Sequence, residues 1–536
     1  MSEFLAGAGV LLVAAACAGA ILLPPGRLRG AVMVLAMALF PVLIAGDQWH
    51  TAQIVDLRHD EARIVALLAI AATVIALLTY LFRRWPILFP LAVIFALPFR
   101  VPLEAGGDTA NLLVPLYLVI AAGVLATVVR DWPLLPGGGY DREDSPGRES
   151  PRSETGPAGP LAIVLSAVVV LYGLQTLYSE DFSQGLQNLC FFLVPFTIAY
   201  RLLREVEWDR RLLRWALAVV AVEAVVFVLI GSVEWVTRSL FWNDQVIRSN
   251  EFHTYFRVNS VFWDPNVYGR YLALVTVLAT GAMLWARTRD TFWLLSGLIL
   301  ILWIGLVPTY SQSSFIALLA GLAVLAAIRW GKPRWTLAAV AIGCVGIAAV
   351  VLLAGGRVDV DRINIITGGR ANLVEGGAEL FSERPLQGYG SGSFQTAYKE
   401  HREDKDVPVS ESHTEPITVA AEQGLIGLAA YVALITVALW TLGKGLWSGR
   451  PAGPVSDTSP APTGAGPASS PPAGGAARAA ILAAFIALLV HTLSYAGFFD
   501  DPITWVLLAV GASLAHSGAS GVRDYEVERV DEDARD

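Results

Sequence analysis

The feature that most constrains this chain is the number of long apolar stretches along it. Windows of about 20 apolar residues, enough for a helix to cross the hydrocarbon core of a bilayer, recur through most of the 536 residues. Only 16% of the residues are charged, against roughly a quarter in an ordinary soluble domain, and the mean hydropathy is +0.56. A soluble enzyme with a single anchor is excluded, and the sequence predicts an all-α integral membrane protein.

The apolar windows predict a polytopic helical bundle of about 12–15 transmembrane helices. They lie near residues 4–23, 29–46, 64–82, 86–99, 111–129, 161–178, 188–203, 212–231, 266–286, 291–307, 311–329, 335–354, 416–441, 478–496 and 502–516. The windows at 86–99 and 502–516 are short, so we expect tilted, broken or re-entrant segments there. The first window lacks the positive region of a signal peptide and is expected to be a membrane helix.

Basic residues beside the windows predict an orientation, because they favour the cytoplasmic side of a membrane. They gather in alternate loops, with the largest groups at residues 130–152, 201–214 and 329–334. The intervening loops, including 232–265, are then extracytoplasmic, and the C-terminus is cytoplasmic. We expect a multi-pass protein of the cytoplasmic (inner) membrane with its active site on the extracytoplasmic face.

Composition separates the spans from polar segments. Two segments rich in Gly, Pro, Ala and Ser are expected to be disordered linkers, and the C-terminal tail is acidic. The predicted organisation is N-terminal transmembrane helices at 1–135, a cytoplasmic linker at 136–160, central transmembrane helices at 161–354, a large extracytoplasmic catalytic loop at 355–415, a transmembrane helix at 416–445, a second cytoplasmic linker at 446–477, C-terminal transmembrane helices at 478–516 and an acidic cytoplasmic tail at 517–536.

Charge and cysteine content exclude some functions. The net charge is −8 and no basic stripe is present, so nucleic acid is not expected as a partner. Cys17, Cys190 and Cys344 all lie in apolar runs. There they are expected to be small buried hydrophobic residues rather than disulfide or metal partners.

The loop at 355–415 is where we first look for chemistry, because a long loop in a compact protein is usually functional. Arg370 follows two glycines and opens a predicted helix at 371–382. Gly388 and Gly390 belong to a glycine-rich turn, in which backbone N–H groups can approach an anion closely. A turn-rich connector without ligand is an equally good interpretation.

His413 stands at the mouth of the span at 416–441, where Pro416 suits the first helical turn. Glu415 and Glu422 are close in sequence. An imidazole there would accept a proton from a sugar hydroxyl or donate a hydrogen bond to a diphosphate. The alternative is an ordinary surface histidine.

A second polar group follows the loop at 232–265. Arg257, Asp264 and Asn266 precede or open a span, and Arg270 lies about one turn inside it. An unpaired charge at that depth costs several kcal/mol, so Arg270 is expected to face a wet cavity or a partner such as Asp264. Arginine suits a diphosphate because its planar fork donates two parallel hydrogen bonds.

A polar cluster at residues 310–314 opens a further span and includes Gln312. Serine at the start of a helix can accept hydrogen bonds from the first N–H groups. We therefore expect this cluster either to cap the helix or to line the same cavity as Arg270.

Together these residues resemble the bacterial O-antigen ligase and O-antigen polymerase superfamily. The resemblance covers about residues 250–440 and is carried by Arg257 with Pro265-Asn266, Gly369-Arg370, Pro385 to Gly390, His413, and Glu422 to Gly427. Two positions depart from the usual pattern. The family's Ser-Arg-Gly is Ser311-Gln312-Ser313 in this chain, and its His-Asn is His413-Thr414.

The resemblance implies a metal-independent glycosyltransferase with no cofactor and no nucleotide sugar. The donor would be a glycan linked to polyprenyl diphosphate in the bilayer, and the acceptor hydroxyl would belong to a glycan, a lipid or a protein. His413, Arg370 and Arg257 are the implied catalytic residues. The expected substrate-binding residues are Arg270, Asn266, Asp264, Gln312, Gly388, Gly390 and Glu422.

Other functions remain open on the sequence. Charges inside spans, such as Glu223 and Arg270, also suit a polytopic transporter or flippase of envelope precursors. A catalytically silent relative would act as a scaffold for envelope assembly. Ligase and polymerase share one chemistry and differ in the acceptor, which no residue identifies.

Overall fold

The computed structural model describes residues 3–105, 108–131, 159–241, 243–252, 255–331, 370–401, 412–446 and 473–516. Within these ranges 11 helices are long and apolar enough to cross a membrane, and two shorter apolar helices, Pro160–Thr176 and Pro502–His516, accompany them. The chain is a multi-pass membrane protein, and the predicted all-α polytopic fold is confirmed. The predicted span at 335–354, most of both predicted linkers and the tail at 517–536 lie outside the described residues.

The chain divides into two compact units, each assembled from segments far apart in the sequence. Unit 1 comprises Met1–Val206, Asp359–Ala438 and Thr492–Val506, and unit 2 comprises Glu207–Val358, Leu439–His491 and Leu507–Asp536. The predicted division into consecutive segments stays a prediction. The helix after the second linker begins at Ala473, where an alanine-rich run favours helix.

Unit 1 is built on membrane helices that pack through small residues. Its helices include α1 (Glu3–Leu22), α2 (Arg27–Asp47), α4 (Glu61–Arg84), the short α5 (Leu88–Ala96), α6 (Val114–Asp131) and α7 (Pro160–Thr176). α8 (Phe182–Asn188), the π-helix η1 (Leu189–Leu193) and α9 (Val194–Arg204) together form one candidate span. α1 packs against α2, α7 and α9. A Cβ on Gly173 of α7 would lie 2.8 Å from that of Ala14 on α1. Such close backbone approach is typical of helix packing in membranes.

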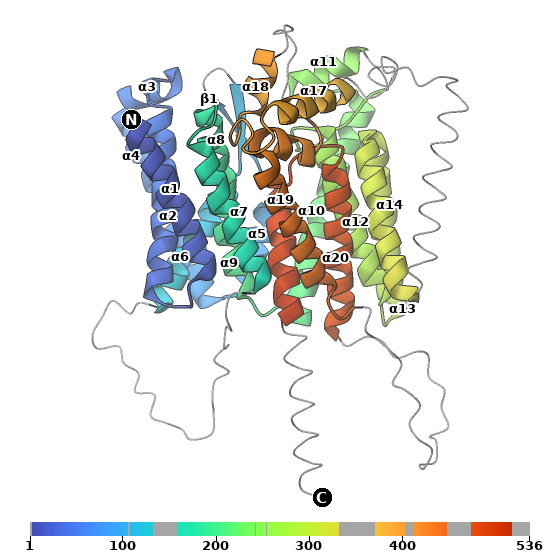
Figure 1. Cartoon of the computed structure of the whole chain (residues 1–536). Coiled ribbons are helices and arrows are strands. Elements are labelled where there is room, and N and C mark those ends of the chain that lie inside the picture. The colour runs from blue at the N-terminus through green and yellow to red at the C-terminus, as the bar shows by residue number, and fades with distance from the viewer. Residues whose placement is uncertain are drawn as a thin grey trace, which may run out of the picture. The chain divides into compact units, whose positions relative to one another are not determined.

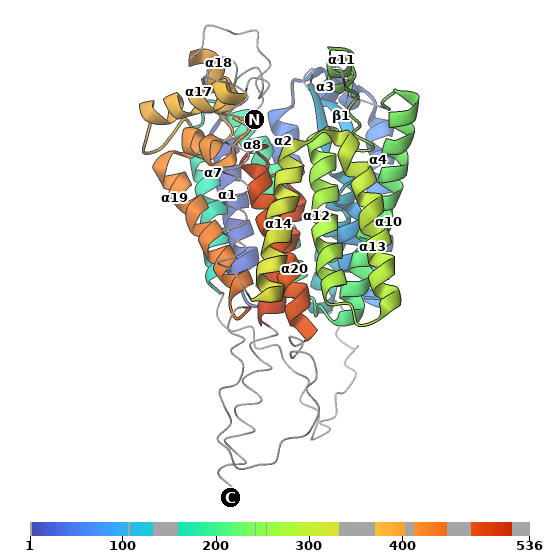
Figure 2. The same ribbon diagram turned by 90° about the vertical axis from the view of Figure 1, so that its right-hand side faces the viewer.

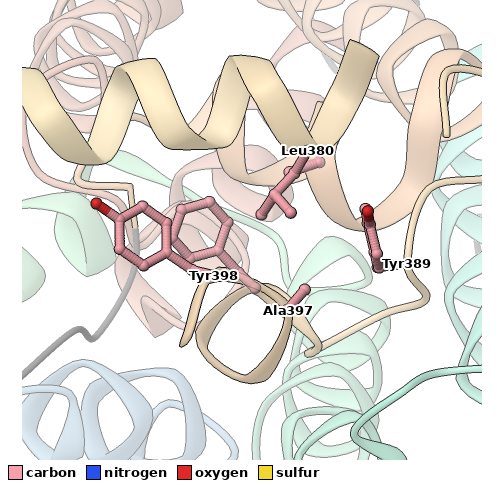
Figure 3. Close-up of a cluster of buried hydrophobic side chains, with 6 residues drawn as sticks. Leu380, Tyr389, Ala397 and Tyr398 are labelled. Atoms are coloured by element: carbon pink, nitrogen blue, oxygen red, sulfur yellow. The ribbon is translucent and has the colours of Figure 1, made fainter. Parts of the chain in front are cut away.

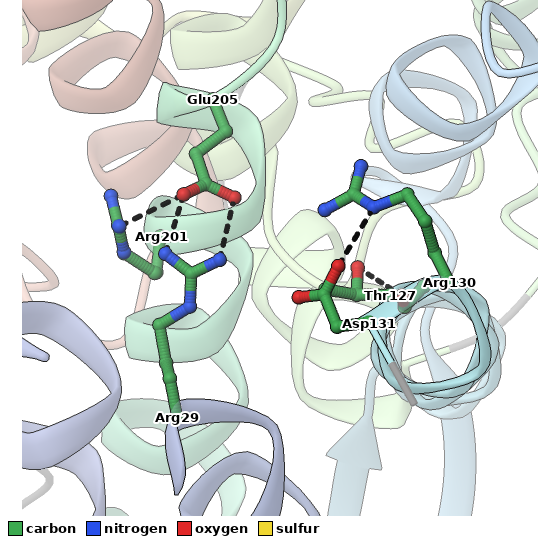
Figure 4. A network of polar contacts seen from close by, with 7 residues as sticks. Arg29, Thr127, Arg130, Asp131, Arg201 and Glu205 are labelled. Atoms are coloured by element: carbon green, nitrogen blue, oxygen red, sulfur yellow. Dashed lines mark hydrogen bonds and ion pairs between the residues drawn. The ribbon is translucent and has the colours of Figure 1, made fainter. Parts of the chain in front are cut away.

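An ion cluster joins α2 to α9 in unit 1 (Figure 4). Glu205 accepts hydrogen bonds from both terminal nitrogens of Arg29, one at 3.1 Å, and lies 2.8 Å from Arg201 Nη2. The side chain of Arg29 is 1% exposed. One carboxylate shared by two arginines offsets part of the cost of burying these charges. Arg130 and Asp131 form a separate surface pair at the end of α6.

A small antiparallel hairpin interrupts the helical fold of unit 1. Strands β1 (Val101–Ala105) and β2 (Asp108–Leu112) pair with Val101 opposite Leu112. In the sequence analysis these residues fell between the windows at 86–99 and 111–129, and no strand was predicted there. Hydropathy windows of about 20 residues do not register strands this short.

Two short helices cover one end of unit 1. α17 (Arg370–Glu383) and α18 (Phe394–His401) lie across that end in Figure 1, where α3 (Ala52–His59) and β1 also lie. The predicted helix at 371–382 is confirmed. Figure 3 shows the apolar side chains that hold these helices together. The cluster consists of Leu380, Tyr389, Phe394, Ala397, Tyr398 and Ala421.

Unit 2 contains a second group of spanning helices. They are α10 (Arg210–Thr237), α12 (Pro265–Leu284), α13 (Arg289–Leu306), α14 (Gln312–Trp330) and α20 (Ala473–Thr492), with the short α11 (Asp244–Phe252) and the 3₁₀ turn η2 (Val307–Thr309). Figure 2 shows α10, α12, α13 and α14 side by side, and α12 packs against the other three. Glycine again permits close packing, since a Cβ on Gly281 of α12 would lie 2.6 Å from Ala480 of α20.

Candidate functional site

The predicted site residues form two sets, one in each unit. Unit 2 holds Arg257, Asp264, Asn266, Arg270 and Gln312, and unit 1 holds Arg370, Gly388, Gly390, His413 and Glu422.

Arg257 is fixed at one end of unit 2 by several hydrogen bonds. Its guanidinium Nε donates to the carbonyl of Thr309 at 2.9 Å, and its Nη2 donates to Oδ1 of Asn266 at 3.1 Å. The Asn250 side chain bonds both the N–H and the carbonyl of Arg257. The structure therefore brings together two of the predicted residues, Arg257 and Asn266, and orients the guanidinium before any ligand binds.

A buried glutamate that the sequence analysis missed anchors the loop carrying Arg257. Glu234, at the end of α10, is 0% exposed. Its Oε2 accepts hydrogen bonds from the backbone N–H groups of Asn259 at 3.2 Å and Ser260 at 2.8 Å. The only signal in the sequence was an acidic residue near the end of an apolar window.

Asp264 and Arg270 lie on the first turns of α12. The Asp264 carboxylate accepts a hydrogen bond from the N–H of Asn266 at 2.6 Å, which makes it the N-cap of the helix. Arg270 is 4% exposed, so its side chain points into the protein and not into lipid. Its predicted position beside a wet cavity stays a prediction.

Gln312 is exposed as the first residue of α14, whereas the neighbouring serines are buried. Ser311 caps the helix by accepting from the N–H of Ser314 at 3.4 Å, which confirms the predicted cap. The Ser313 and Ser314 hydroxyls contact Nε2 of His491 on α20. The sequence analysis did not identify His491, because no sequence pattern links it to Ser314, which lies 177 residues earlier.

His413 in unit 1 adopts a left-handed backbone conformation, with φ of 59°. This region is unfavourable for a residue with a Cβ, and such strain is common at functional sites. The half-buried ring lies 5.8 Å from that of Tyr495. Next to it, the Glu415 carboxylate accepts the N–H groups of Gly497 at 2.8 Å and Phe498 at 3.0 Å. The segment after α20 thus supports the helix start that carries His413.

The helix that follows, α19 (Glu415–Gly443), breaks at Gly424, where φ is 62° and ψ is −162°. The break leaves backbone groups without helical partners, and the glycine-rich turn supplies them. Tyr389 and Gly390 donate N–H bonds to the carbonyls of Ala421 and Glu422, at 3.1 and 2.7 Å. In return, the N–H of Leu425 donates to the carbonyl of Pro385 at 2.7 Å. Two motifs that the sequence presents separately are therefore one structural feature.

The Glu422 side chain holds the far side of this turn. Its two carboxylate oxygens accept the N–H groups of Gly392 at 2.9 Å and Phe394 at 3.2 Å, and the residue is 8% exposed. The N–H groups of Gly388 and Gly390 are also occupied, by the carbonyls of Arg384 and Glu422. These contacts within the protein account for Glu422, Gly388 and Gly390. Their predicted contact with substrate stays a prediction.

A third segment, from the end of α7 to the start of α8, packs against the same turn. A Cβ on Gly390 would lie 2.2 Å from the Cα of Ser179, and one on Gly392 would lie 2.6 Å from the nitrogen of Gly185. The Ser391 hydroxyl donates to the carbonyl of Tyr172 at 3.1 Å. The glycines are therefore required by three backbone segments that meet without side chains between them.

A polar cluster near the end of α17 was also missed by the sequence analysis. The Tyr389 hydroxyl donates to Glu383 Oε2 at 2.6 Å, and His401 Nε2 lies 2.5 Å from the same oxygen. The bond from Tyr389, reinforced by the charge of His401, lowers the pKa of Glu383. Burial, reinforced by Glu383, raises the pKa of Tyr389 to about 12.

Arg370 is the first residue of α17, and its catalytic role stays a prediction. Across the part of the chain that the structure describes, no group of three or more His, Cys, Asp or Glu side chains is placed to hold a metal ion.

Residues 297–432 match the family model described as O-antigen ligase. This segment is similar to O-antigen ligases. The predicted resemblance is confirmed, and the match supports an O-antigen ligase-like function in polysaccharide biosynthesis. The matched segment includes His413, Glu422 and the glycine-rich turn, whereas Arg257 and His491 lie outside it. No curated protein matches the chain significantly.

Proposed function

We propose that this protein is a glycosyltransferase that moves a glycan from polyprenyl diphosphate to an acceptor hydroxyl in cell-surface polysaccharide biosynthesis. The reaction takes place at the outer face of the cytoplasmic membrane. The acceptor oxygen forms a bond to the anomeric carbon, the bond from that carbon to the diphosphate breaks, and polyprenyl diphosphate leaves. The C-terminus is on the cytoplasmic side.

The observation that carries the proposal is the O-antigen ligase match over the segment that contains His413 and the broken helix. His413 orients the acceptor hydroxyl and takes its proton as the new bond forms. Its left-handed backbone conformation is of a kind common at functional sites, and the Glu415 carboxylate fixes the chain two residues away by binding the N–H groups of Gly497 and Phe498. Both features support this role.

Arginines offset the charge that grows on the departing diphosphate. Arg257 suits this role because its guanidinium is held by Thr309 and Asn266 in advance and remains charged at any physiological pH. A preorganised cation stabilises a transition state more than a mobile one, since nothing has to reorient during the reaction. We assign the same role to Arg370. Arg270 and Asn266 bind the donor.

The test is the glycan profile of a deletion strain complemented with wild type, His413→Ala, Arg257→Ala or Arg370→Ala. Each variant is matched for membrane expression, and exposed His59→Ala and Arg211→Ala serve as controls. We expect lipid-linked glycan to accumulate with the three site variants alone. Accumulated single units would indicate a polymerase, and finished chains a ligase. Wild-type profiles from all three would refute the site.

One observation favours a second candidate, a transporter or flippase. Glu223 lies in the middle of α10, is 5% exposed, and accepts a hydrogen bond from the Tyr271 hydroxyl at 3.0 Å. Carboxylates at this depth often belong to translocation paths. If the protein is a transporter, Glu223→Gln should block translocation. Lipid-linked glycan would then stay on the cytoplasmic side, where a glycosidase added to spheroplasts cannot reach it. A failed transferase would leave it accessible on the outside.

A further inference from the structure

His491 is a buried polar residue that the proposed reaction does not yet use. It lies in the last turn of α20 and is 0% exposed. Its Nε2 is 3.1 Å from the Ser313 hydroxyl and 3.3 Å from the Ser314 hydroxyl. An imidazole inside a membrane helix costs free energy unless polar atoms surround it. The serines supply such atoms, so the contact joins α20 to the start of α14.

The serines in turn belong to a larger hydrogen-bonded group. The Ser311 hydroxyl lies 2.8 Å from that of Ser314 and 3.1 Å from that of Ser313. The Ser314 hydroxyl also donates to the backbone carbonyl of Asn266 at 3.4 Å, and the N–H of Ser311 donates to the hydroxyl of Thr309 at 3.2 Å. All three serines are at most 3% exposed. The cluster therefore connects α14 to α12 and to η2.

Asn266 and Thr309 both accept hydrogen bonds from the Arg257 guanidinium. A chain of contacts thus runs from His491 through the serines to Asn266 and Thr309, each of which contacts the serine cluster through one polar atom and Arg257 through another. Packing reinforces it, because a Cβ on Gly269 of α12 would lie only 2.6 Å from the Ser314 hydroxyl. Displacement of Ser313 and Ser314 would move both anchors of the guanidinium.

We propose that His491 is a positioning residue that holds the Ser311–Ser313–Ser314 cluster, and through it the Arg257 guanidinium, in the geometry that receives the diphosphate of the donor. This inference rests on the proposed function. The histidine and its serines are too deeply buried to attack a substrate themselves, so their effect is exerted through Arg257. α20 thereby contributes to the site although it lies outside the matched O-antigen ligase segment.

The test measures binding of farnesyl diphosphate to the full chain in nanodiscs, with farnesol as the ligand that lacks the diphosphate. We expect His491→Ala to weaken farnesyl diphosphate binding about tenfold, the equivalent of one or two net hydrogen bonds. Farnesol binding should stay unchanged. His491→Gln, which can still bond a serine hydroxyl, should recover most of the affinity. The double variant Ser313→Ala/Ser314→Ala should match His491→Ala, and the triple variant should lose nothing further.

Leu488→Ala is the matched control, because Leu488 is 0% exposed on the same helix and its truncation also leaves a cavity. It should lower the melting temperature without changing the Kd for farnesyl diphosphate. If Leu488→Ala and His491→Ala weaken binding equally, His491 is only a packing residue and the inference is overturned. If the wild type binds farnesyl diphosphate no better than farnesol, the proposed function itself fails.

Discussion

Gly388 and Gly424 lie against each other, one in the glycine-rich turn and the other at the break in α19. A Cβ on Gly388 would lie 2.6 Å from the backbone nitrogen of Gly424, and a Cβ on Gly424 would lie 2.7 Å from that of Gly388. Both residues have positive φ, 68° and 62°. The turn and the broken helix can therefore pair only if neither residue has a side chain, and this pairing supports α19, which begins two residues after His413.

Alanine at either glycine should disrupt this end of unit 1. For each of Gly388→Ala and Gly424→Ala, backbone strain costs about 1–3 kcal/mol and overpacking adds about 1–3 kcal/mol. We expect a clear drop in melting temperature in detergent and loss of glycan transfer. Gly297→Ala is the control, because Gly297 lies on α13 and a Cβ there would have no neighbouring atom within 4 Å. A melting temperature unchanged in Gly424→Ala would show that the pairing is dispensable.

Two substitutions of Glu422 should show how much its hydrogen bonds contribute to the free energy of unfolding. Glu422→Gln keeps one acceptor oxygen and should cost about 1–2 kcal/mol, whereas Glu422→Ala leaves two buried N–H groups unpaired and should cost about 2–4 kcal/mol. Thermal unfolding in detergent measures which of the two variants is less stable. Exposed Glu400→Gln should have no effect. If Glu422→Ala kept wild-type stability and lost only activity, Glu422 would be a substrate ligand and not a clamp.

The α17–α18 region should lose stability at both ends of the pH scale. The pKa of Glu383 is lower in the fold than its ordinary value of 4.5, so its contribution is present above pH 4.5 and is lost as the pH falls through the folded value. The pKa of Tyr389 is raised from 10.0 to about 12. Its contribution is therefore present below pH 10 and is lost as the pH rises to about 12.

Hydrogen exchange of residues 380–401 against pH measures both losses. Glu383→Gln should abolish the acid transition, and Tyr389→Phe should abolish the alkaline one. If the acid transition persists in Glu383→Gln, another carboxyl group is responsible for it.

The proposed orientation predicts on which side of the membrane two exposed residues, Ser382 and Glu207, lie. Cys17 and Cys190 are 0% exposed, so they give little background to a thiol reagent. In a chain with Cys344→Ala, Ser382→Cys on α17 should react with a membrane-impermeant maleimide added to spheroplasts. Glu207→Cys should react only after permeabilisation. The reverse pattern would place the site on the cytoplasmic side.

The sequence predicted those features that depend on neighbouring residues. Hydropathy gave the spans, and Ser311 and Pro416 marked the starts of their helices correctly. Contacts between distant segments were not predictable in this way. Nothing in the sequence pairs Glu422 with the N–H of Gly392, or His491 with Ser314, because each contact arises only when the helices pack.

Glycine was informative but ambiguous. A glycine-rich turn can expose its N–H groups to an anion or can allow backbones to meet, and composition does not distinguish the two. In this chain the N–H groups of Gly388, Gly390 and Gly392 already donate to protein acceptors. The close approach of neighbouring backbone, and not an open anion cradle, explains these residues.

The most direct test of the central claim is glycan transfer by the purified protein in proteoliposomes. The donor is the lipid-linked glycan extracted from the deletion strain, and the acceptor is supplied by membranes of that strain. Release of polyprenyl diphosphate and attachment of the glycan are measured together. We predict that wild type releases and transfers in equal amounts, and that His413→Ala lowers the rate by about 10²–10⁴-fold, the usual contribution of a general acid–base group. Equal rates for His413→Ala and wild type, or no release by wild type, would contradict the account.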